Sequence, residues 1–179
     1  VVFGRLRKWL ATISSLSSFC LVSTPYMMSV ASHYFDSKKI FMMPDTTSKT
    51  LDFEKLARLV NDKLSRARGS RQMKIAWFGM GDNPYFDVGL TDLWVHASDL
   101  LALKNEGYDI HVNILTNQRA LSSNNLRALN SLPIQISLDL WTLAKEQSLL
   151  SASFASFIPI GTNSFSKAKT LNRCLTSIE

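Results

Sequence analysis

Short apolar runs alternate with amphipathic segments along the second half of the chain. The runs predict strands at 75–78, 110–114, 134–138 and 154–160. Between them, apolar residues recur at helical spacing over 91–101, 121–129 and 143–150. Thr91 is the expected N-cap of the first of these helices, and Gly107 its expected end. Strands joined by single helices favour right-handed crossovers, so the pattern predicts an α/β fold: a Rossmann-like parallel sheet with helices on both faces.

The first part of the chain carries a weaker version of the same alternation. Strands are expected at 19–23 and 40–43, with a helix from Pro25 between them. The apolar segment 9–30 is interrupted by serines and by Pro25, which argues against a signal peptide or a membrane span. It predicts a buried helix followed by a short strand. Residues 1–48 are therefore expected to be the tail of another α/β domain, the N-terminal one.

A separate amphipathic stretch joins these two regions. Leu51 to Leu64 has an apolar stripe of helical period, with Asp52 and Glu54 in its first turn, and predicts a surface helix. The following residues, 65–71, are rich in Arg, Ser and Gly and predict an exposed connection. Residues 49–72 are thus a linker helix and a basic connection, and 73–179 form a partial Rossmann-like domain.

The net charge of the chain limits the kinds of molecule that it is expected to bind. The net charge is +6 and the pI is near 9.5, which favours nucleic acid, phospholipid surfaces or nucleoside diphosphates. Aromatic residues do not interleave with the basic clusters as a base-stacking surface would need, so nucleic acid is not expected.

Cysteine and histidine usage predicts no metal centre. Cys20 and Cys174 are far apart and lack metal-ligand spacing, so the sequence indicates neither a disulfide framework nor a zinc site, and a reducing compartment fits best. The histidines lack a carboxylate or nucleophile at a readable spacing and are expected to be structural; they are His33, His96 and His111.

The most informative motif follows the last predicted strand. Residues 165–173 place Lys169, Asn172 and Arg173 at a strand-to-helix turn, where backbone N–H groups and the helix dipole favour an anion. Lys169 and Arg173 are four apart and are expected on one helical face, whereas Lys167 points elsewhere. The alternative is an ordinary solvated basic face. The place after a central strand favours phosphate binding.

A glycine turn follows the first predicted strand of this domain. Gly79 and Gly81 begin a segment that resembles a dinucleotide fingerprint, but Pro84 stands where the third glycine should be. No P-loop pattern is present either. The turn is either a place where backbone approaches a ligand or a facing domain, or a merely permissive loop.

A polar residue also follows the third predicted strand. Asp139, beside Trp141, lies at the expected ligand edge, where the pair could contact a ribose or base. A role in starting the next helix is equally open for Asp139.

Taken together, these segments resemble bacterial glycosyltransferases of the GT-B fold, the group 1-like enzymes. The matching segments are Ile75–Gly79 with Asn83-Pro84, then Gly89–Leu93, Phe157–Ile160 and Phe165 through Arg173. The resemblance covers 73–179, the C-terminal nucleotide-sugar-binding domain, and extends loosely to 22–24 and 43–45. The chain begins at Val1 and stops at Glu179, so a fragment of a longer protein is expected.

The resemblance implies transfer of a sugar from a nucleoside diphosphate sugar to an acceptor hydroxyl, in glycan or polysaccharide biosynthesis, without a cofactor or metal. Lys169 would meet the diphosphate, Asn172 and Arg173 would support it or the sugar, and the Gly79–Gly81 turn would face the acceptor domain. Two departures from the family stand out. Thr176 occupies the place where relatives have a glutamate, and no acid precedes the strand at Phe154.

The resemblance also sets the expected partners and location. The partners are a nucleotide sugar and a glycan or lipid-linked acceptor, with peripheral membrane contact through the basic N-terminal segment. The expected location is cytoplasmic, extending to the inner face of the membrane. The catalytic base would come from an N-terminal domain that is nearly absent, so these residues alone are not expected to catalyse. The alternative is a non-catalytic α/β module that binds a nucleotide or a protein.

Overall fold

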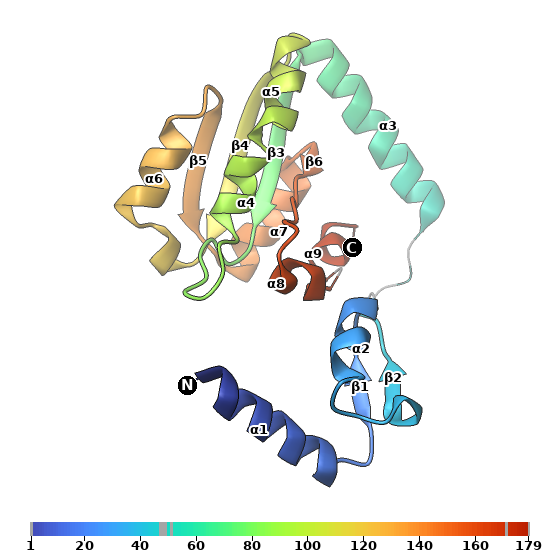
Figure 1. The fold of residues 1–179 in the computed structure, drawn as a ribbon. Coiled ribbons are helices and arrows are strands. Elements are labelled where there is room, and N and C mark those ends of the chain that lie inside the picture. Colours follow the sequence, from blue (N-terminus) through green and yellow to red (C-terminus); the bar gives the residue numbers. More distant parts are fainter. Residues whose placement is uncertain (1, 47–49, 51, 171, 179) are drawn as a thin grey trace. The chain divides into compact units, whose positions relative to one another are not determined.

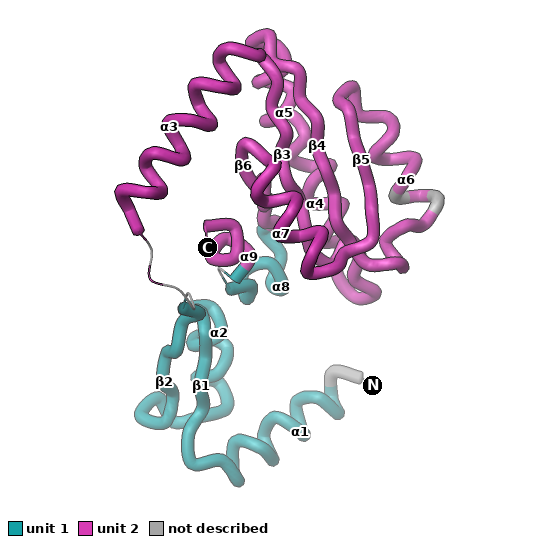
Figure 2. Tube along the Cα trace, turned by 180° about the vertical axis from the view of Figure 1, so that it is seen from behind, with its two compact units in different colours: residues 1–46, 162–172 teal, residues 47–161, 173–179 magenta. Residues whose placement is uncertain are grey.

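The computed structural model describes residues 2–46, 50, 52–170 and 172–178, and for residues 2, 3, 123 and 125 it describes the backbone alone (Figure 1). The chain divides into two compact units (Figure 2). Unit 1 comprises 1–46 and 162–172, and unit 2 comprises 47–161 and 173–179. The domain division drawn from the sequence stays a prediction, because compact units within one chain are not by themselves domains.

Unit 1 is a small α/β unit built on two parallel strands. Its elements are α1 (Val2–Leu16), β1 (Cys20–Val22), α2 (Pro25–Ala31), η1 (Ser37–Lys39), β2 (Ile40–Met42) and α8 (Ser164–Ala168). β1 pairs with β2 so that Cys20 lies opposite Ile40. α2 begins at Pro25 because Thr24 caps it, its hydroxyl accepting from the Met27 N–H at 3.1 Å. The two strands and the helix between them are confirmed.

The expectation of a buried helix before β1 is wrong. α1 has no buried side chain among residues 4–16, and Trp9 is 59% exposed. An amphipathic sequence forms a helix of this kind, but burial of its apolar stripe needs a neighbouring surface that sequence periodicity does not supply.

Unit 2 holds the predicted parallel sheet. Its elements are α3 (Phe53–Ser70), β3 (Gln72–Phe78), α4 (Leu90–Val95), α5 (Ala97–Asn105), β4 (Asp109–Thr116), η2 (Gln118–Ala120), α6 (Ser123–Asn130), β5 (Gln135–Leu140), α7 (Leu143–Ala152), β6 (Ala155–Ser156) and α9 (Asn172–Ile178), the last beginning at the final residue of unit 1. The strand order is β5-β4-β3-β6, with every pair parallel. Helices α4 and α5 cover one face, and α7 covers the other (Figures 1 and 2). The α/β class is thus confirmed.

The core of unit 2 is formed by the two central strands. Ile75 and Trp77 of β3 and Val112 and Ile114 of β4 are at most 4% exposed. Leu93 of α4 and other helix residues pack on them. The continuous apolar run made 75–78 recognisable as a buried central strand, and the alternation of apolar with polar residues made 110–114 recognisable as a strand.

The predicted strand 154–160 is much shorter in the structure. β6 pairs with β3 only at Ala155 and Ser156, flanked by hydrogen bonds from the Phe154 N–H to the Lys74 carbonyl and from the Phe157 N–H to the Ala76 carbonyl. Pro159 has no N–H to donate, so the ladder cannot continue through it. The apolar run therefore overestimates the length of the strand.

The predicted helix 91–101 is two helices. α4 ends and α5 begins at His96, and the N-cap of α4 is Gly89 instead of Thr91. The Gly89 N–H donates to the Asp92 carboxylate at 3.1 Å, which places the helix start two residues before the expected cap. Gly89 has φ 96°, a conformation that a residue with a Cβ rarely adopts.

The exposed connection expected at 65–71 is also wrong, because α3 continues to Ser70. Most of these residues are Arg, Ala and Ser, which tolerate helix well, and a single Gly69 costs only about 1 kcal/mol. Ala67 is 4% exposed against the core, so packing favours the continuation. The helix ends at Arg71, whose φ is 56°. The expected start at Leu51 lies outside the described residues.

Candidate functional site

The strand order of the sheet defines one edge where a ligand site would form. From β3 the chain moves through β4 to β5 on one side, and it then returns to place β6 on the other side of β3. In open parallel sheets, ligands bind beyond the carboxyl ends of the strands where the order reverses in this way. The candidate site is therefore the edge after β3, at Gly79.

The loop that leaves β3 is held in a tight conformation. Gly79 has φ 142°, and its N–H donates to the Leu115 carbonyl at 3.1 Å. A Cβ on Gly81 would lie 2.4 Å from the Thr116 hydroxyl oxygen and 2.6 Å from the Ala120 Cβ. A Cβ on Gly89 would lie 2.5 Å from the Gly81 carbonyl oxygen. The glycines are thus required by close packing, and the permissive-loop alternative does not describe this turn.

Residues after β4 fix this loop through polar contacts. The Asn117 side chain accepts from the Gly81 N–H at 2.9 Å and donates to Asp82 at 2.8 Å. Arg119 pairs with the same Asp82 carboxylate at 2.5 Å. The Thr116 hydroxyl, 0% exposed as a residue, donates to the Gly79 carbonyl at 3.0 Å. Sequence reasoning missed this network, although Thr116-Asn117 follows a strand at the predicted ligand edge.

Asp82 has a shifted pKa as a result. Its partial desolvation acts to raise the pKa, but hydrogen bonds from Asn117 and Arg119, with the charge of Arg119, outweigh this and hold the pKa below its ordinary value. The carboxylate is therefore charged at neutral pH and occupied by its partners.

A polar cavity of about 380 Å³ lies within the loop, lined by residues 81–88 and by Thr91. Asn83 shapes one wall, because its side chain accepts from the N–H groups of Tyr85 and Phe86 at 2.9 and 3.1 Å. Tyr85 is 85% exposed at the rim. The volume falls in the lower part of the range of roughly 300–1,000 Å³ that small-molecule sites occupy.

Arg173, at the start of α9, lies at the same edge. Its guanidinium donates to the Phe78 carbonyl at 3.1 Å and lies 5.8 Å from the centre of the Trp77 ring. Burial lowers the pKa of Arg173, while the charge of Asp92 opposes that shift. Trp77 is 1% exposed, and its indole N–H has no hydrogen-bond partner among the described residues. Gly79 is close enough that a Cβ there would be 3.0 Å from the Arg173 Nη1.

Of the three predicted residues, Arg173 belongs to unit 2 and lies at this edge, whereas Lys169 and Asn172 belong to unit 1, and their place in the site stays a prediction. The expectation that Lys169 and Arg173 share a helical face is wrong. Lys169 is the extended C-cap of α8, with its ammonium 5.5 Å from the Phe165 ring centre, and Arg173 belongs to the next helix, α9. Helical spacing counts only within one continuous helix, and this chain leaves the helix at Lys169.

Asp139 and Trp141 lie at the other side of the sheet. Asp139 is inside β5, opposite Leu115, and its carboxylate pairs with Lys145 at 2.6 Å. The hydrogen bond from Lys145 is the main cause that lowers the pKa of Asp139. The Trp141 indole donates to Glu146, whose residue is 9% exposed. Both side chains therefore fasten α7 to the end of β5, and their contact with a ribose or base stays a prediction.

The described residues contain no group of three or more His, Cys, Asp or Glu side chains that could hold a metal ion. None of their helices is long and apolar enough to cross a membrane. The His111 ring is hydrogen-bonded to the Ser137 hydroxyl at 2.8 Å across β4 and β5. The His96 ring lies 3.8 Å from Asp99, and the His33 Nδ1 lies 2.9 Å from the Ser29 carbonyl oxygen.

Comparison with protein-family models, with curated proteins and with solved structures finds no match for this chain.

Proposed function

We propose that the edge beyond β3 binds a nucleoside diphosphate. We further propose that the chain is part of a glycosyltransferase, which moves a sugar from a nucleotide sugar to the hydroxyl of a glycan or lipid-linked acceptor. The observation that carries the proposal is the glycine loop at the point where the strand order reverses. Gly79, at φ 142°, leaves its backbone without a Cβ beside the Arg173 guanidinium. A cation beside a glycine turn at such an edge suits a diphosphate.

The roles within this proposal differ from residue to residue. Gly79 and Gly81 would let backbone approach the ligand, and Arg173 would face its phosphates. For Lys169 and Asn172, which belong to unit 1, contacts with the diphosphate and sugar are proposed on the family resemblance alone. Asp139 and Trp141 would contact the ribose or base only by giving up their present partners, Lys145 and Glu146.

A non-catalytic α/β module that binds a nucleotide or a protein is the second candidate. The carboxylates favour it, because Asp82 and Asp139 are both in ion pairs. Acids held in this way are poorly placed for general acid-base chemistry.

Calorimetric titration of the 179-residue chain with UDP, GDP and their sugars tests the binding proposal. We expect one nucleotide to bind and Arg173→Gln to weaken it by about 1.5–3 kcal/mol, the loss typical of a charged hydrogen bond. Arg127→Gln is the matched control, since it removes the same charge from an exposed position of α6 in the same unit and should bind as the unchanged chain does. Gly79→Ala should abolish binding, because the new Cβ crowds Arg173.

The outcomes separate the candidates. Binding of a nucleotide together with hydrolysis or transfer of its sugar by a longer chain supports the glycosyltransferase. Binding without any turnover in such a chain favours the non-catalytic module. If no nucleotide or nucleotide sugar binds, both the glycosyltransferase and the nucleotide-binding module are contradicted at this edge.

A further inference from the structure

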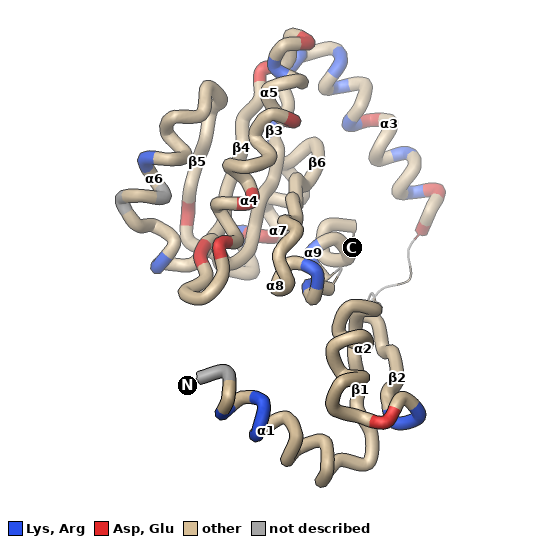
Figure 3. Tube along the Cα trace, in the orientation of Figure 1, with Lys and Arg blue, Asp and Glu red and all other residues tan. Residues whose placement is uncertain are grey.

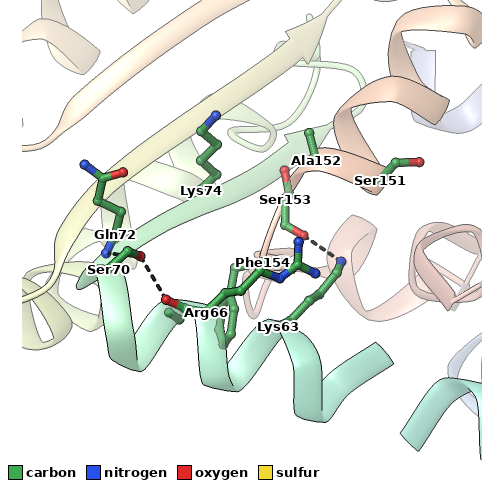
Figure 4. Close-up of a pocket in the computed structure, with 10 residues that line it drawn as sticks. Lys63, Arg66, Ser70, Gln72, Lys74, Ser151, Ala152, Ser153 and Phe154 are labelled. Carbon is green, nitrogen blue, oxygen red and sulfur yellow. Dashed lines mark hydrogen bonds between the residues drawn. The ribbon is translucent and has the colours of Figure 1, made fainter. Parts of the chain in front are cut away.

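A second pocket in unit 2 lies at the opposite edge of the sheet from the glycine loop. It is a cavity of about 200 Å³ between the ends of α3 and α7, beside the amino ends of β3 and β6 (Figure 4). We call it the basic pocket, and its polar wall is formed by Lys63, Arg66, Ser70, Lys74, Ser151 and Ser153. These residues come from α3, β3 and the end of α7, so distant parts of the chain build it together.

The basic pocket has an excess of positive charge. Lys63, Arg66 and Lys74 line it, and no described carboxylate lies within ion-pair distance of any of the three. Figure 3 shows that Lys and Arg predominate in the carboxyl-terminal half of α3. The carboxyl ends of α3 and α7 oppose this charge, but each helix end contributes only about −0.5 charge. About two positive charges therefore remain uncompensated.

The cations of the basic pocket use only some of their hydrogen-bond donors within the chain. The Lys63 ammonium donates to the Ser153 carbonyl at 2.6 Å, and the Arg66 Nε donates to the Asp62 carbonyl at 3.3 Å. An ammonium carries three donors and a guanidinium five, so several remain. Burial lowers the pKa of Lys63, and the neighbouring charge of Arg66 adds to that shift, as expected where like charges meet without a counter-ion.

Ser153 adds a separate observation. The residue is 3% exposed, and its hydroxyl has no hydrogen-bond partner among the described residues. Buried hydroxyls are normally paired, so an unpaired one needs an explanation. A bound oxyanion that accepts from this hydroxyl, after rotation about the Cα–Cβ bond, would supply the missing partner.

We propose that the basic pocket binds a phosphoryl group through Lys63, Arg66 and Lys74. A volume of about 200 Å³ is smaller than the roughly 300–1,000 Å³ of whole-ligand sites, so it accommodates a phosphate rather than a complete nucleotide sugar. The pocket is thus separate from the nucleotide edge, and the inference stands independently of the proposed function.

Titration of the isotopically labelled chain with inorganic phosphate, followed by amide NMR shifts at constant ionic strength, tests the proposal. Saturable shifts are expected at residues 70–74 and 151–154. Arg66→Gln and Lys74→Gln should each weaken phosphate binding about tenfold, the size of one charge-assisted hydrogen bond. Arg68→Gln is the matched control, because Arg68 lies on the same helix, is exposed and does not line the pocket.

Three results would overturn the proposal. They are shifts that do not saturate, equal shifts on titration with chloride, or an equal loss of affinity in Arg68→Gln. Circular dichroism of each variant verifies the fold. A nucleotide titration that shifts the amide signals of residues 79–90 and leaves those of residues 70–74 unchanged would separate the two sites. It would show that phosphate binding in the basic pocket is independent of the nucleotide site.

Vesicles distinguish the source of the phosphoryl group. Phosphatidylcholine vesicles with and without phosphatidic acid are compared by sedimentation. Weaker binding of Arg66→Gln than Arg68→Gln to the acidic vesicles identifies a lipid phosphate. Equal binding of the two, with the phosphate titration positive, identifies a soluble phosphorylated molecule.

Discussion

At the scale of single residues, Gly81 is where the loop beyond β3 tolerates least change. A Cβ there would lie 2.4 Å from the Thr116 hydroxyl oxygen and 3.0 Å from the Leu90 Cγ. Gly81→Ala is expected to lower the free energy of unfolding by about 1–3 kcal/mol, because one methyl group overpacks a site with no space. Urea unfolding followed by circular dichroism measures the change.

Gly69→Ala provides the contrasting glycine substitution. A Cβ on Gly69 meets nothing within 4 Å, and the residue is helical in α3. Alanine there should raise the free energy of unfolding by up to about 1 kcal/mol, since it lowers the entropy of the unfolded chain. Equal effects at both glycines would contradict the packing described around Gly81.

The lowered pKa of Asp82 predicts that the free energy of unfolding depends on pH. Its pKa in the folded chain is held below the unfolded value of about 3.9, so its contribution is fully present above that pH. The contribution is lost as the pH falls through the lower, folded pKa. As the pH falls below about 4, the free energy of unfolding should therefore decrease less in Asp82→Asn than in the unchanged chain.

Thermal unfolding across this pH range, with Asp87→Asn as the control, checks the prediction. Asp87 lies in the same loop and is in no ion pair among those described, so Asp87→Asn removes a carboxylate of the loop without removing the Asn117 and Arg119 contacts. Parallel profiles for the unchanged chain and Asp82→Asn would mean that the Asn117 and Arg119 contacts do not hold in solution.

At the scale of elements, α1 is where the membrane contact expected from the sequence can be tested. Leu6, Trp9 and Leu16 are 48%, 59% and 81% exposed, and no acidic residue precedes Asp36. On a helical projection these apolar residues share one side and Arg7 and Lys8 lie away from it, whereas Arg5 falls next to Leu16 at the border of the apolar side.

Sedimentation with phosphatidylserine vesicles tests this role of α1. Replacing Arg5, Arg7 and Lys8 by Gln should weaken binding by about 3 kcal/mol at low salt, from about 1 kcal/mol for each basic residue. The matched control replaces Lys38 and Lys39, which are basic residues of the same unit in η1. Binding that is equally strong with purely phosphatidylcholine vesicles would contradict an electrostatic contribution.

At the scale of the whole molecule, unit 2 carries its own sheet and its own loop network. All strand pairs of the four-stranded sheet, and the Asn117, Asp82 and Arg119 contacts, lie within it. A chain of residues 50–179 is therefore expected to keep cooperative urea unfolding and the tryptophan fluorescence of the buried Trp77. Loss of cooperativity would show that residues 1–46 are needed for this unit to fold.

The sequence by itself determined the α/β class, the strands 75–78, 110–114 and 134–138, and the approximate positions of most helices. Local periodicity carries this information, because a strand is either continuously apolar, as at 75–78, or alternates apolar with polar residues, as at 110–114 and 134–138, and an amphipathic helix repeats its apolar face. The sequence also located the glycine turn, since Gly79 and Gly81 stand directly after a strand. The glycosyltransferase resemblance rests on such segments and stays a proposal.

Only the tertiary structure decided which residues meet. Ladder pairing ended β6 at Ser156, packing of Ala67 extended α3 to Ser70, and the break after Lys169 placed it and Arg173 on different helices. The Asn117–Asp82–Arg119 network and the basic pocket join side chains that are dozens of residues apart. Such contacts depend on where the strands and helices lie in space, and no local spacing in the sequence records that arrangement.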